Sequence, residues 1–251
     1  MTGIPSQRPP VSRRDGRAPD ESRPIQITRG YTSHAPGSVL IATGETRVLC
    51  TACVEEGVPR FLQSAGAGWL TAEYRMLPSS TSGRRPRDSA RGRIDGRDNE
   101  IQRLIGRSLR AVVDRTAWTD LTVWIDCDVL QADGGTRSAA ISGAYVAMVD
   151  AFRWMQEQDR LKKWPIRSGL AAVSVGVVDG VPLLDLDYSE DSRAEVDLNV
   201  VLANAGRFVE IQGTAESAPF DRDRLDRLLA LAVSGGERIL ARQAEALEGA
   251  A

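Results

Sequence analysis

The stretch from Leu121 to Met155 most constrains the fold, because a strand-like run leads there through a glycine pair into a helical pattern. The run from Leu121 to Val129 is mostly apolar and predicts a strand. Beyond Gly134 and Gly135, apolar residues recur at spacings of three and four, which predicts a helix: Ile141, Ala144, Tyr145, Met148, Phe152 and Met155. The chain should therefore contain a strand, a tight turn and a long helix in direct succession.

The glycine pair also makes the start of this helix a candidate phosphate site. Glycine permits a tight turn and leaves main-chain N–H groups exposed at the first helical turn. Those donors, the positive end of the helix dipole and Arg137 together suit an anion. Most turns of this kind bind nothing, and the stretch has no Gly-Lys-Ser or Gly-Lys-Thr, so it is not a P-loop.

Composition indicates an ordinary globular protein. The 251 residues are 42% hydrophobic and 26% charged, with a net charge of −2, and they suffice for one large domain or two small ones. No apolar run approaches the roughly 20 residues of a membrane span. The first residues are polar and arginine-rich without the apolar segment of a secretory signal. We therefore expect no membrane association and a cytoplasmic location.

The cysteines do not indicate a redox or zinc site. Cys50 and Cys53 fit C-x-x-C, but they lie in the strand-like run from Thr46 to Val54, where residues three apart point to opposite faces. The only other cysteine is Cys127, and the chain has a single histidine. We expect buried free thiols.

The order of the predicted elements indicates an α+β fold with mixed β-sheets built from hairpins and helices packed against them. Residues 1–22, rich in Arg and Pro, predict a mobile arm, and residues 23–248 a single domain. The other expected strands begin at Ile25 or span Ser38–Ala42, Thr46–Val54, Leu70–Leu77, Leu170–Val178, Pro182–Tyr188, Val196–Ala203 and Arg207–Ile211. Two more helices are expected, one capped by Asp98 and one from Asp221 to Leu247 with an interruption at Gly235-Gly236.

A second unusual stretch, Ser79 to Arg97, is a long loop rich in arginine. Its arginines are Arg84, Arg85, Arg87, Arg91, Arg93 and Arg97. A flexible arginine cluster without aromatic residues suits sequence-independent contacts to a nucleic-acid backbone. A disordered surface loop is an equally good interpretation. Arg97, like Arg137, stands at a predicted helix start, so the two could hold one anion between them.

Six carboxylates crowd the thirteen residues from Asp185 to Asp197. Asp185 and Asp187 are predicted to share one face of a strand. Oxygen ligands without His or Cys favour Mg²⁺ or Mn²⁺ over zinc. Taken alone, the run fits a solvated connection better. Together, a phosphate cradle, an oxygen-ligand metal site and an arginine-rich loop are the equipment of phosphoryl transfer on a nucleic acid.

Nearly the whole chain, from about residue 14 to 245, resembles the ribonuclease PH family. The matching segments are Arg23-Pro24, 37–40 (GSVL), 48–51 (VLCT), 55–61 (EEGVPRF), 68–74 (GWLTAEY), 100–105 (EIQRLI), 126–137 (DCDVLQADGGTR), 190–192 (EDS) and 212–216 (QGTAE). The resemblance implies a phosphorolytic 3′→5′ exoribonuclease that trims precursor tRNA 3′ ends and releases nucleoside diphosphates. It implies a reversible reaction, other RNA 3′ ends as partners, and a homohexamer built as a trimer of dimers.

The resemblance also implies roles for particular residues. Inorganic phosphate, the co-substrate, is held by Arg97, Gly135, Thr136 and Arg137. Asp191 and Asp197 hold Mg²⁺ or Mn²⁺, one of them also assisting protonation of the leaving 3′ oxygen, and with Arg97 and Arg137 they form the catalytic set. Arg84 and Arg87 lie in the loop that grips tRNA, and we assign Arg85 and Arg91 to the same surface. Ser79 replaces an arginine common in the family, which puts one tRNA contact in doubt.

Two other functions compete with this interpretation. A non-catalytic RNA-binding ring subunit would tend to lose the phosphate arginines or the acidic pair, and this chain has both. A hydrolytic metal-dependent nuclease would have no need to hold free phosphate.

Overall fold

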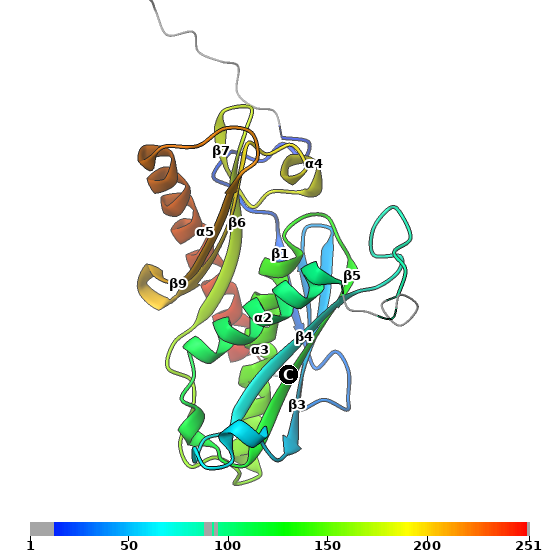
Figure 1. The fold of residues 1–251 in the computed structure, drawn as a ribbon, viewed down its shortest axis with the longest axis vertical. Coiled ribbons are helices and arrows are strands. Elements are labelled where there is room, and N and C mark those ends of the chain that lie inside the picture. The colour runs from blue at the N-terminus through cyan, green and yellow to red at the C-terminus, as the bar shows by residue number, and fades with distance from the viewer. Residues whose placement is uncertain (1–12, 88–91, 93–94, 250–251) are drawn as a thin grey trace, which may run out of the picture.

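The computed structural model describes residues 13–87, 92 and 95–249, and they form two β-sheets with helices on and between them (Figure 1). The first sheet has five strands in the order β1-β2-β3-β5-β4. Their bounds are β1 Ile25–Arg29, β2 Gly37–Thr43, β3 Thr46–Glu56, β5 Leu121–Gln131 and β4 Trp69–Met76. The hairpin expected around Gly44 is confirmed, because Thr43 of β2 pairs with Thr46 of β3. β4 runs parallel to β5 and is an edge strand.

The second sheet has four antiparallel strands in the order β7-β6-β8-β9. Their bounds are β7 Val181–Leu184, β6 Leu170–Val178, β8 Val196–Ala203 and β9 Arg207–Ala215. β9 is longer than expected and β7 is shorter. The chain leaves β7 at Asp185, whose φ is 54°, and then forms the short helix α4, Tyr188–Asp191. The prediction that Asp185 and Asp187 share a strand face is therefore wrong.

The predicted central helix is α3, Thr136–Glu157, and it lies between the two sheets. It packs on β2, β3 and β5 of the first sheet and on β6 of the second. Sixteen of its 22 residues are buried. Small residues make this close approach possible: a Cβ at Gly143 would lie 2.7 Å from Ile41 Cγ2 and 2.8 Å from Cys50 Sγ.

Two further helices cover the sheets. α2, Gly96–Ala111, begins at Asp95, whose side chain accepts a hydrogen bond from the Arg97 N–H. The cap is thus Asp95, and Asp98 is buried in the first turn.

Short 3₁₀ turns span Arg60–Leu62, Arg115–Ala117 and Asn204–Gly206. Within the part of the chain that the structure describes, no helix has the length and apolar character needed to cross a membrane.

α5, Arg222–Glu248, is capped by Asp221 and packs on the second sheet. The expected interruption at Gly235-Gly236 is absent from this helix. A Cβ at Gly235 would lie 2.6 Å from Leu184 Cδ1, and one at Gly236 would clash with Leu202. The two glycines therefore allow the helix to approach the sheet closely, and this packing outweighs their low helix propensity.

The predicted mobile arm is wrong for residues 13–22, while residues 1–12 lie outside the described residues. Arg13 and Arg17 are buried and ion-paired with Glu190 and Asp185. A chain segment held by buried ion pairs is part of the folded body. The three cysteines are free, as expected. Cys50 and Cys127 are buried opposite each other in β3 and β5, whereas Cys53 is only half-buried.

Candidate active site

The turn before α3 has the conformation that its glycines predict. Gly134 and Gly135 have φ values of 74° and 67°, and Gly135 is the residue that precedes the helix. No side chain among the described residues caps this helix start, so its first N–H groups can bind an anion. We call residues 133–137 the cradle. Its Thr136 hydroxyl lies 2.9 Å from the Tyr74 hydroxyl of β4. Burial raises the pKa of Tyr74 to about 12, which keeps this phenol protonated and able to donate.

Arg137 joins three elements at the mouth of the cradle. Its Nη1 donates to Gln212 Oε1 of β9 at 3.1 Å and lies 3.6 Å from Glu100 Oε2 of α2. Gln212 Nε2 in turn donates to Glu100 Oε1 at 3.1 Å. Helix α2, helix α3 and strand β9 are therefore tied together by one half-buried polar cluster, which holds the guanidinium beside the helix start.

Two carboxylates, Asp191 and Asp197, interact electrostatically with Arg137, and Asp191 also interacts with Arg97. The pKa of Asp197 is raised to about 6, first by burial and then by the negative charge of Asp191, while Arg137 opposes the rise. Desolvation by the surrounding protein raises the pKa of Asp191, and Arg97, Arg137 and Arg23 oppose that rise. Arg97 and Arg137 act electrostatically on Asp191, and Arg137 also acts on Asp197, so these side chains from four different elements lie within electrostatic range of one another.

The other residues of the acidic stretch have structural partners instead. Asp185 pairs with Arg23 at 2.6 Å, and Glu190 pairs with Arg13 at 2.8 Å. Asp187 caps α4 by accepting a hydrogen bond from the Glu190 N–H. Glu195 Oε1 accepts a hydrogen bond from the Gly180 N–H at 2.7 Å. The stretch is therefore not one metal site, and of its six carboxylates Asp191 and Asp197 remain for that role. No group of three or more His, Cys, Asp or Glu suited to a metal occurs within the described residues.

The base of the arginine-rich loop lies beside the cradle. The Ala132 N–H donates to Ser80 O at 2.8 Å, and the Leu77 N–H donates to Val129 O at 3.0 Å. Arg84 and Arg87 are exposed, as is Ser79, while Arg85 is half-buried with Nη2 4.0 Å from Asp95 Oδ2. Arg91 lies outside the described residues. The described arginines thus extend from a point next to the site into solvent.

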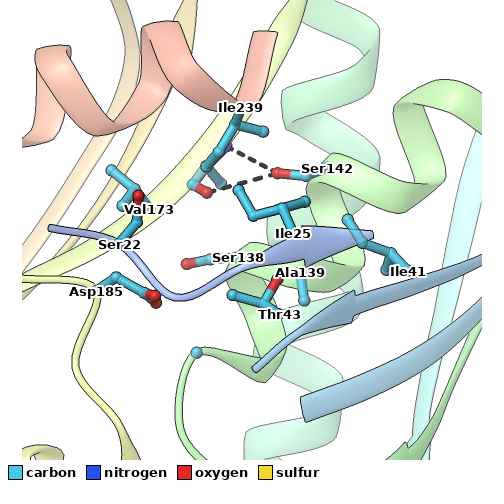
Figure 2. A pocket seen from close by; sticks show the side chains of 12 residues that line it. Ser22, Ile25, Ile41, Thr43, Ser138, Ala139, Ser142, Val173, Asp185 and Ile239 are labelled. Atoms are coloured by element: carbon cyan, nitrogen blue, oxygen red, sulfur yellow. Dashed lines mark hydrogen bonds between the residues drawn. The ribbon is translucent and has the colours of Figure 1, made fainter. Parts of the chain in front are cut away.

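Behind the cradle, α3 is joined to the second sheet (Figure 2). Ser142 Oγ accepts a hydrogen bond from the Ala172 N–H of β6 at 3.1 Å. Ser138 and Ala139 line a small pocket with Asp185 and Ser22. The cradle is thus supported on its inner side by the sheet whose strand β8 carries Asp197.

Sequence reasoning missed two residues of this site. Tyr74 and Arg23 both lie in segments that match the family, but their side chains reach the cradle from strands or loops distant in sequence. Arg23 is 4% exposed and donates to Asp185 from Nε at 2.9 Å. A buried arginine with a buried carboxylate partner carries no local signal in a sequence.

Comparison with known proteins agrees with this geometry. Residues 21–153 match the model of the 3′ exoribonuclease family, domain 1, and residues 170–235 match domain 2 of the same family. Ribonuclease PH of Rhodococcus erythropolis is 58% identical over 238 residues, which are 94% of this chain and 91% of that protein. Ribonuclease PH of Mycolicibacterium smegmatis is also 58% identical, over 94% of this chain and 92% of that protein.

Solved structures agree on the fold. An Archaeoglobus fulgidus exosome structure with RNA bound to the active site has a TM-score of 0.79 at 21% identity, covering 92% of this chain and 92% of that one. Rice (Oryza sativa) Rrp46 has a TM-score of 0.76 at 20% identity, covering 94% of this chain and 100% of that one. The α+β fold and the family expected from the sequence are confirmed: this chain belongs to the 3′ exoribonuclease family.

Proposed function

We propose that this site carries out the phosphate-dependent removal of nucleotides from RNA 3′ ends, which makes the chain a phosphorolytic 3′→5′ exoribonuclease of the ribonuclease PH type. An oxygen of inorganic phosphate attacks the phosphorus of the last phosphodiester. The bond to the 3′ oxygen of the preceding nucleotide breaks, and that oxygen takes up a proton. The products are a nucleoside 5′-diphosphate and an RNA shortened by one nucleotide. The reverse reaction adds a nucleotide.

One arrangement supports this proposal: no described side chain caps the start of α3, and Arg97 and Arg137 act electrostatically on the carboxylate pair Asp191 and Asp197. The free N–H groups of α3, with Thr136, Arg97 and Arg137, would hold the attacking phosphate. Phosphate and an RNA phosphodiester are both anions, so a nucleophile of this kind needs positive groups to bring it close. A hydrolase would use water in that place and gain nothing from a phosphate cradle.

The carboxylate pair suits a divalent metal ion. Asp197 Oδ1 is buried without a hydrogen-bond partner among the described residues, and Asp191 raises the pKa of Asp197. A cation between the two carboxylates would relieve both penalties. Mg²⁺ commonly uses one or two carboxylates together with water and substrate phosphates. Asp191 and Asp197 would hold Mg²⁺ or Mn²⁺, which would neutralise negative charge on the RNA phosphate.

The RNA substrate would reach the site past the arginine-rich loop. Arg84, Arg85 and Arg87 lie at its described end, and Arg91 belongs to the same loop. Their charges suit the backbone of a precursor tRNA or another RNA 3′ end without reading its sequence. Because the proposed substrates are cellular RNAs, we assign the activity to the cytoplasm.

We also infer that the chain works as a homohexamer, a trimer of dimers. Within the described residues, β4 lies at one edge of the first sheet and β9 at one edge of the second. Phe208 and Ile211 of β9 are 46% and 44% exposed, and exposed strand edges with apolar side chains favour association. Light scattering would test the assembly, and a monomer at micromolar concentration would contradict it.

The activity is tested with an RNA labelled in its 3′ nucleotide, purified protein and Mg²⁺, with and without inorganic phosphate. We expect labelled nucleoside diphosphate only in the presence of phosphate. Nucleoside monophosphate formed without phosphate would establish a hydrolase instead. Bound RNA without any product would establish the competing function, a non-catalytic RNA-binding subunit.

A further inference from the structure

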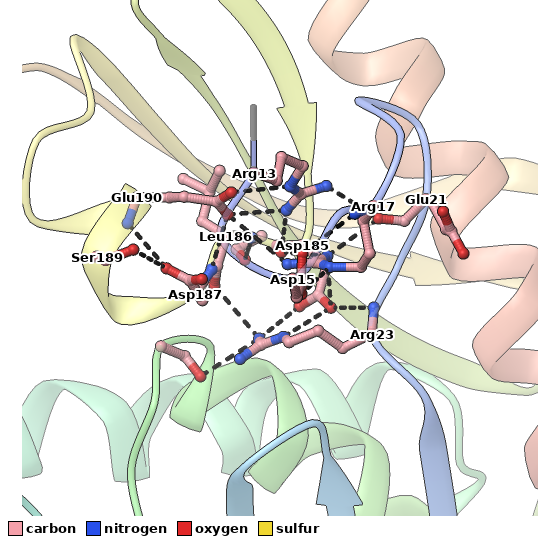
Figure 3. A network of polar contacts seen from close by, with 12 residues as sticks. Arg13, Asp15, Arg17, Glu21, Arg23, Asp185, Leu186, Asp187, Ser189 and Glu190 are labelled. Atoms are coloured by element: carbon pink, nitrogen blue, oxygen red, sulfur yellow. Dashed lines mark hydrogen bonds and ion pairs between the residues drawn. The ribbon is translucent and has the colours of Figure 1, made fainter. Parts of the chain in front are cut away.

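Arg23 lies between the cradle and the segment that carries Asp191 (Figure 3). Its guanidinium donates to the carbonyl oxygen of Asp133 and, at 3.5 Å, to that of Gly134. It also donates to Leu186 O at 3.3 Å. The first two acceptors belong to the cradle and the third belongs to the segment leading into α4. One side chain thus bridges two segments about 50 residues apart in sequence.

Asp185 fixes the orientation of this guanidinium. Its carboxylate accepts from Arg23 Nε at 2.9 Å, from Nη2 at 2.6 Å and from the Arg23 main-chain N–H at 2.8 Å. Burial by itself would lower the pKa of Arg23, but the Asp185 hydrogen bonds and charge outweigh it and raise that pKa. Arg23 is therefore charged and held in one orientation, as a planar two-pronged contact requires.

The surrounding structure leaves these segments little freedom. A Cβ on Gly134 would lie 2.6 Å from Leu186 O and 2.8 Å from the Tyr188 nitrogen, so the two backbones touch. Thr46 holds the cradle from its other side, because its Oγ1 donates to Gly134 O at 2.7 Å and accepts from the Asp133 N–H at 2.8 Å. The Asp133 and Gly134 carbonyls point at Arg23 and Thr46, and because each peptide is planar and trans, the N–H groups of Gly134 and Gly135 point the opposite way.

Two other N-terminal arginines, Arg13 and Arg17, hold the segment that leads into and forms α4. Arg13 donates to both oxygens of Glu190 at 2.8 Å, and both side chains are almost fully buried. Arg13 Nη2 and Arg17 Nη1 also donate to Asp185 O, at 2.9 and 3.0 Å. Arg23 is the member of this N-terminal group that reaches across to the cradle.

We propose that Arg23 is a positioning residue that aligns the phosphate cradle with the carboxylate pair. This inference rests on the proposed function, because it takes the cradle to be the binding site of phosphate. Arg23 does not touch the phosphate. It acts by fixing the carbonyls of Asp133 and Gly134, and hence the direction of the α3 N–H groups, relative to the segment that ends in Asp191.

Arg23→Gln tests the proposal, with Arg29→Gln as a matched control. Arg29 is also a largely buried β1-region arginine with a two-pronged carboxylate contact, at 2.8 Å to both oxygens of Asp150. Asp150 is 14 residues along α3 from Thr136, about 21 Å at 1.5 Å per residue. Both variants lose a largely buried ion pair, but only Arg23→Gln loses contacts to the cradle.

Two readouts are compared in both variants: the phosphate KM of phosphorolysis at saturating RNA, and the phosphate concentration needed to raise Tm. We expect Arg23→Gln to raise both by about tenfold or more, because aligned donors are lost, with unchanged RNA affinity. Arg23→Lys should recover part of this loss. Arg29→Gln should lower Tm and leave both phosphate readouts within about twofold of the wild type.

Equal phosphate effects in the two variants would overturn the proposal, and so would a normal phosphate KM in Arg23→Gln. Should Arg23→Gln not fold, Asp185→Asn replaces it, because that change keeps the side-chain shape and frees the guanidinium from its charged partner. The Tm readout needs no activity. A wild type that binds phosphate but releases no nucleoside diphosphate would defeat the proposed function and leave the role of Arg23 measurable.

Discussion

Asp197→Asn should stabilise the protein at neutral pH while it damages the active site. Burial and the negative charge of Asp191 disfavour the ionised form of the Asp197 carboxyl. Its pKa is therefore about 6 in place of the ordinary 3.8. Asparagine has nearly the same shape and keeps an acceptor for Asn199 Nδ2, which donates to Asp197 Oδ2 at 3.2 Å. The substitution therefore removes the charge with little change in packing, and functional carboxylates often carry such a stability cost.

The sign and size follow from the two pKa values. A carboxyl with a raised folded pKa binds its proton more tightly in the folded state, so folding loses stability as pH rises from about 4 to about 6. A difference of about two pH units at 1.36 kcal/mol each amounts to about 3 kcal/mol. Because Asp197 is only half-buried, solvent screening reduces this, and we expect about 1–3 kcal/mol.

Urea denaturation in metal-free buffer measures the free energy of unfolding for both proteins at pH values from 4 to 8. The advantage of Asp197→Asn over the wild type should be smallest at pH 4, grow up to about pH 6.5 and then stay constant. Added Mg²⁺ should stabilise the wild type more than the variant. A stability difference that is the same at pH 4 and pH 7.5 would refute the argument that Asp197 is strained by its charge.

Three further predictions concern the ligands. Arg137→Ala should raise the phosphate KM or reduce kcat by about tenfold or more, because a charged contact to phosphate is lost, and leave tRNA affinity nearly unchanged in a filter-binding assay; loss of tRNA binding would remove Arg137 from the phosphate role. Replacing Arg84, Arg85 and Arg87 by Ala should weaken tRNA binding and reduce the slope of log K against log salt by roughly 2–3; an unchanged slope would exclude the loop from the RNA path. Tyr74→Phe removes only the hydroxyl next to the cradle threonine and should raise the phosphate KM about threefold to tenfold, whereas an unchanged KM would show that this contact is only structural.

The helix starts at the site could be predicted because their signals are local. A glycine pair between an apolar run and a period of three to four residues predicts where α3 begins, and the structure confirms this helix start. The exact start of α2 could not be predicted in the same way. Asp95 and Asp98 are both good caps, and only the backbone conformation at Asp95 chooses between them.

The error at the N-terminal arm concerns contacts between distant segments, whereas the error at Asp185 is one of local backbone conformation. Arg13 and Arg17 look like solvated residues, because their partners Glu190 and Asp185 lie about 170 positions away. The alternation from Asp185 to Asp187 suggested a strand face, but a positive φ at a residue other than glycine ended the strand, and no sequence rule forecasts that conformation. The convergence of Asp197 with Arg137 came from the family resemblance, since spacing alone cannot bring two elements together.

The burial of α3 has a consequence for how the molecule unfolds. The two family domains meet on this helix, and its contacts with β3 and β6 belong to different sheets. If either sheet opened, one flank of an apolar helix would be left in water, so partial opening is costly. Calorimetry should therefore record a single heat-absorption peak for the chain. When either family domain is expressed separately, its backbone amide hydrogens should exchange rapidly with solvent. It should also bind a dye that reports exposed apolar surface.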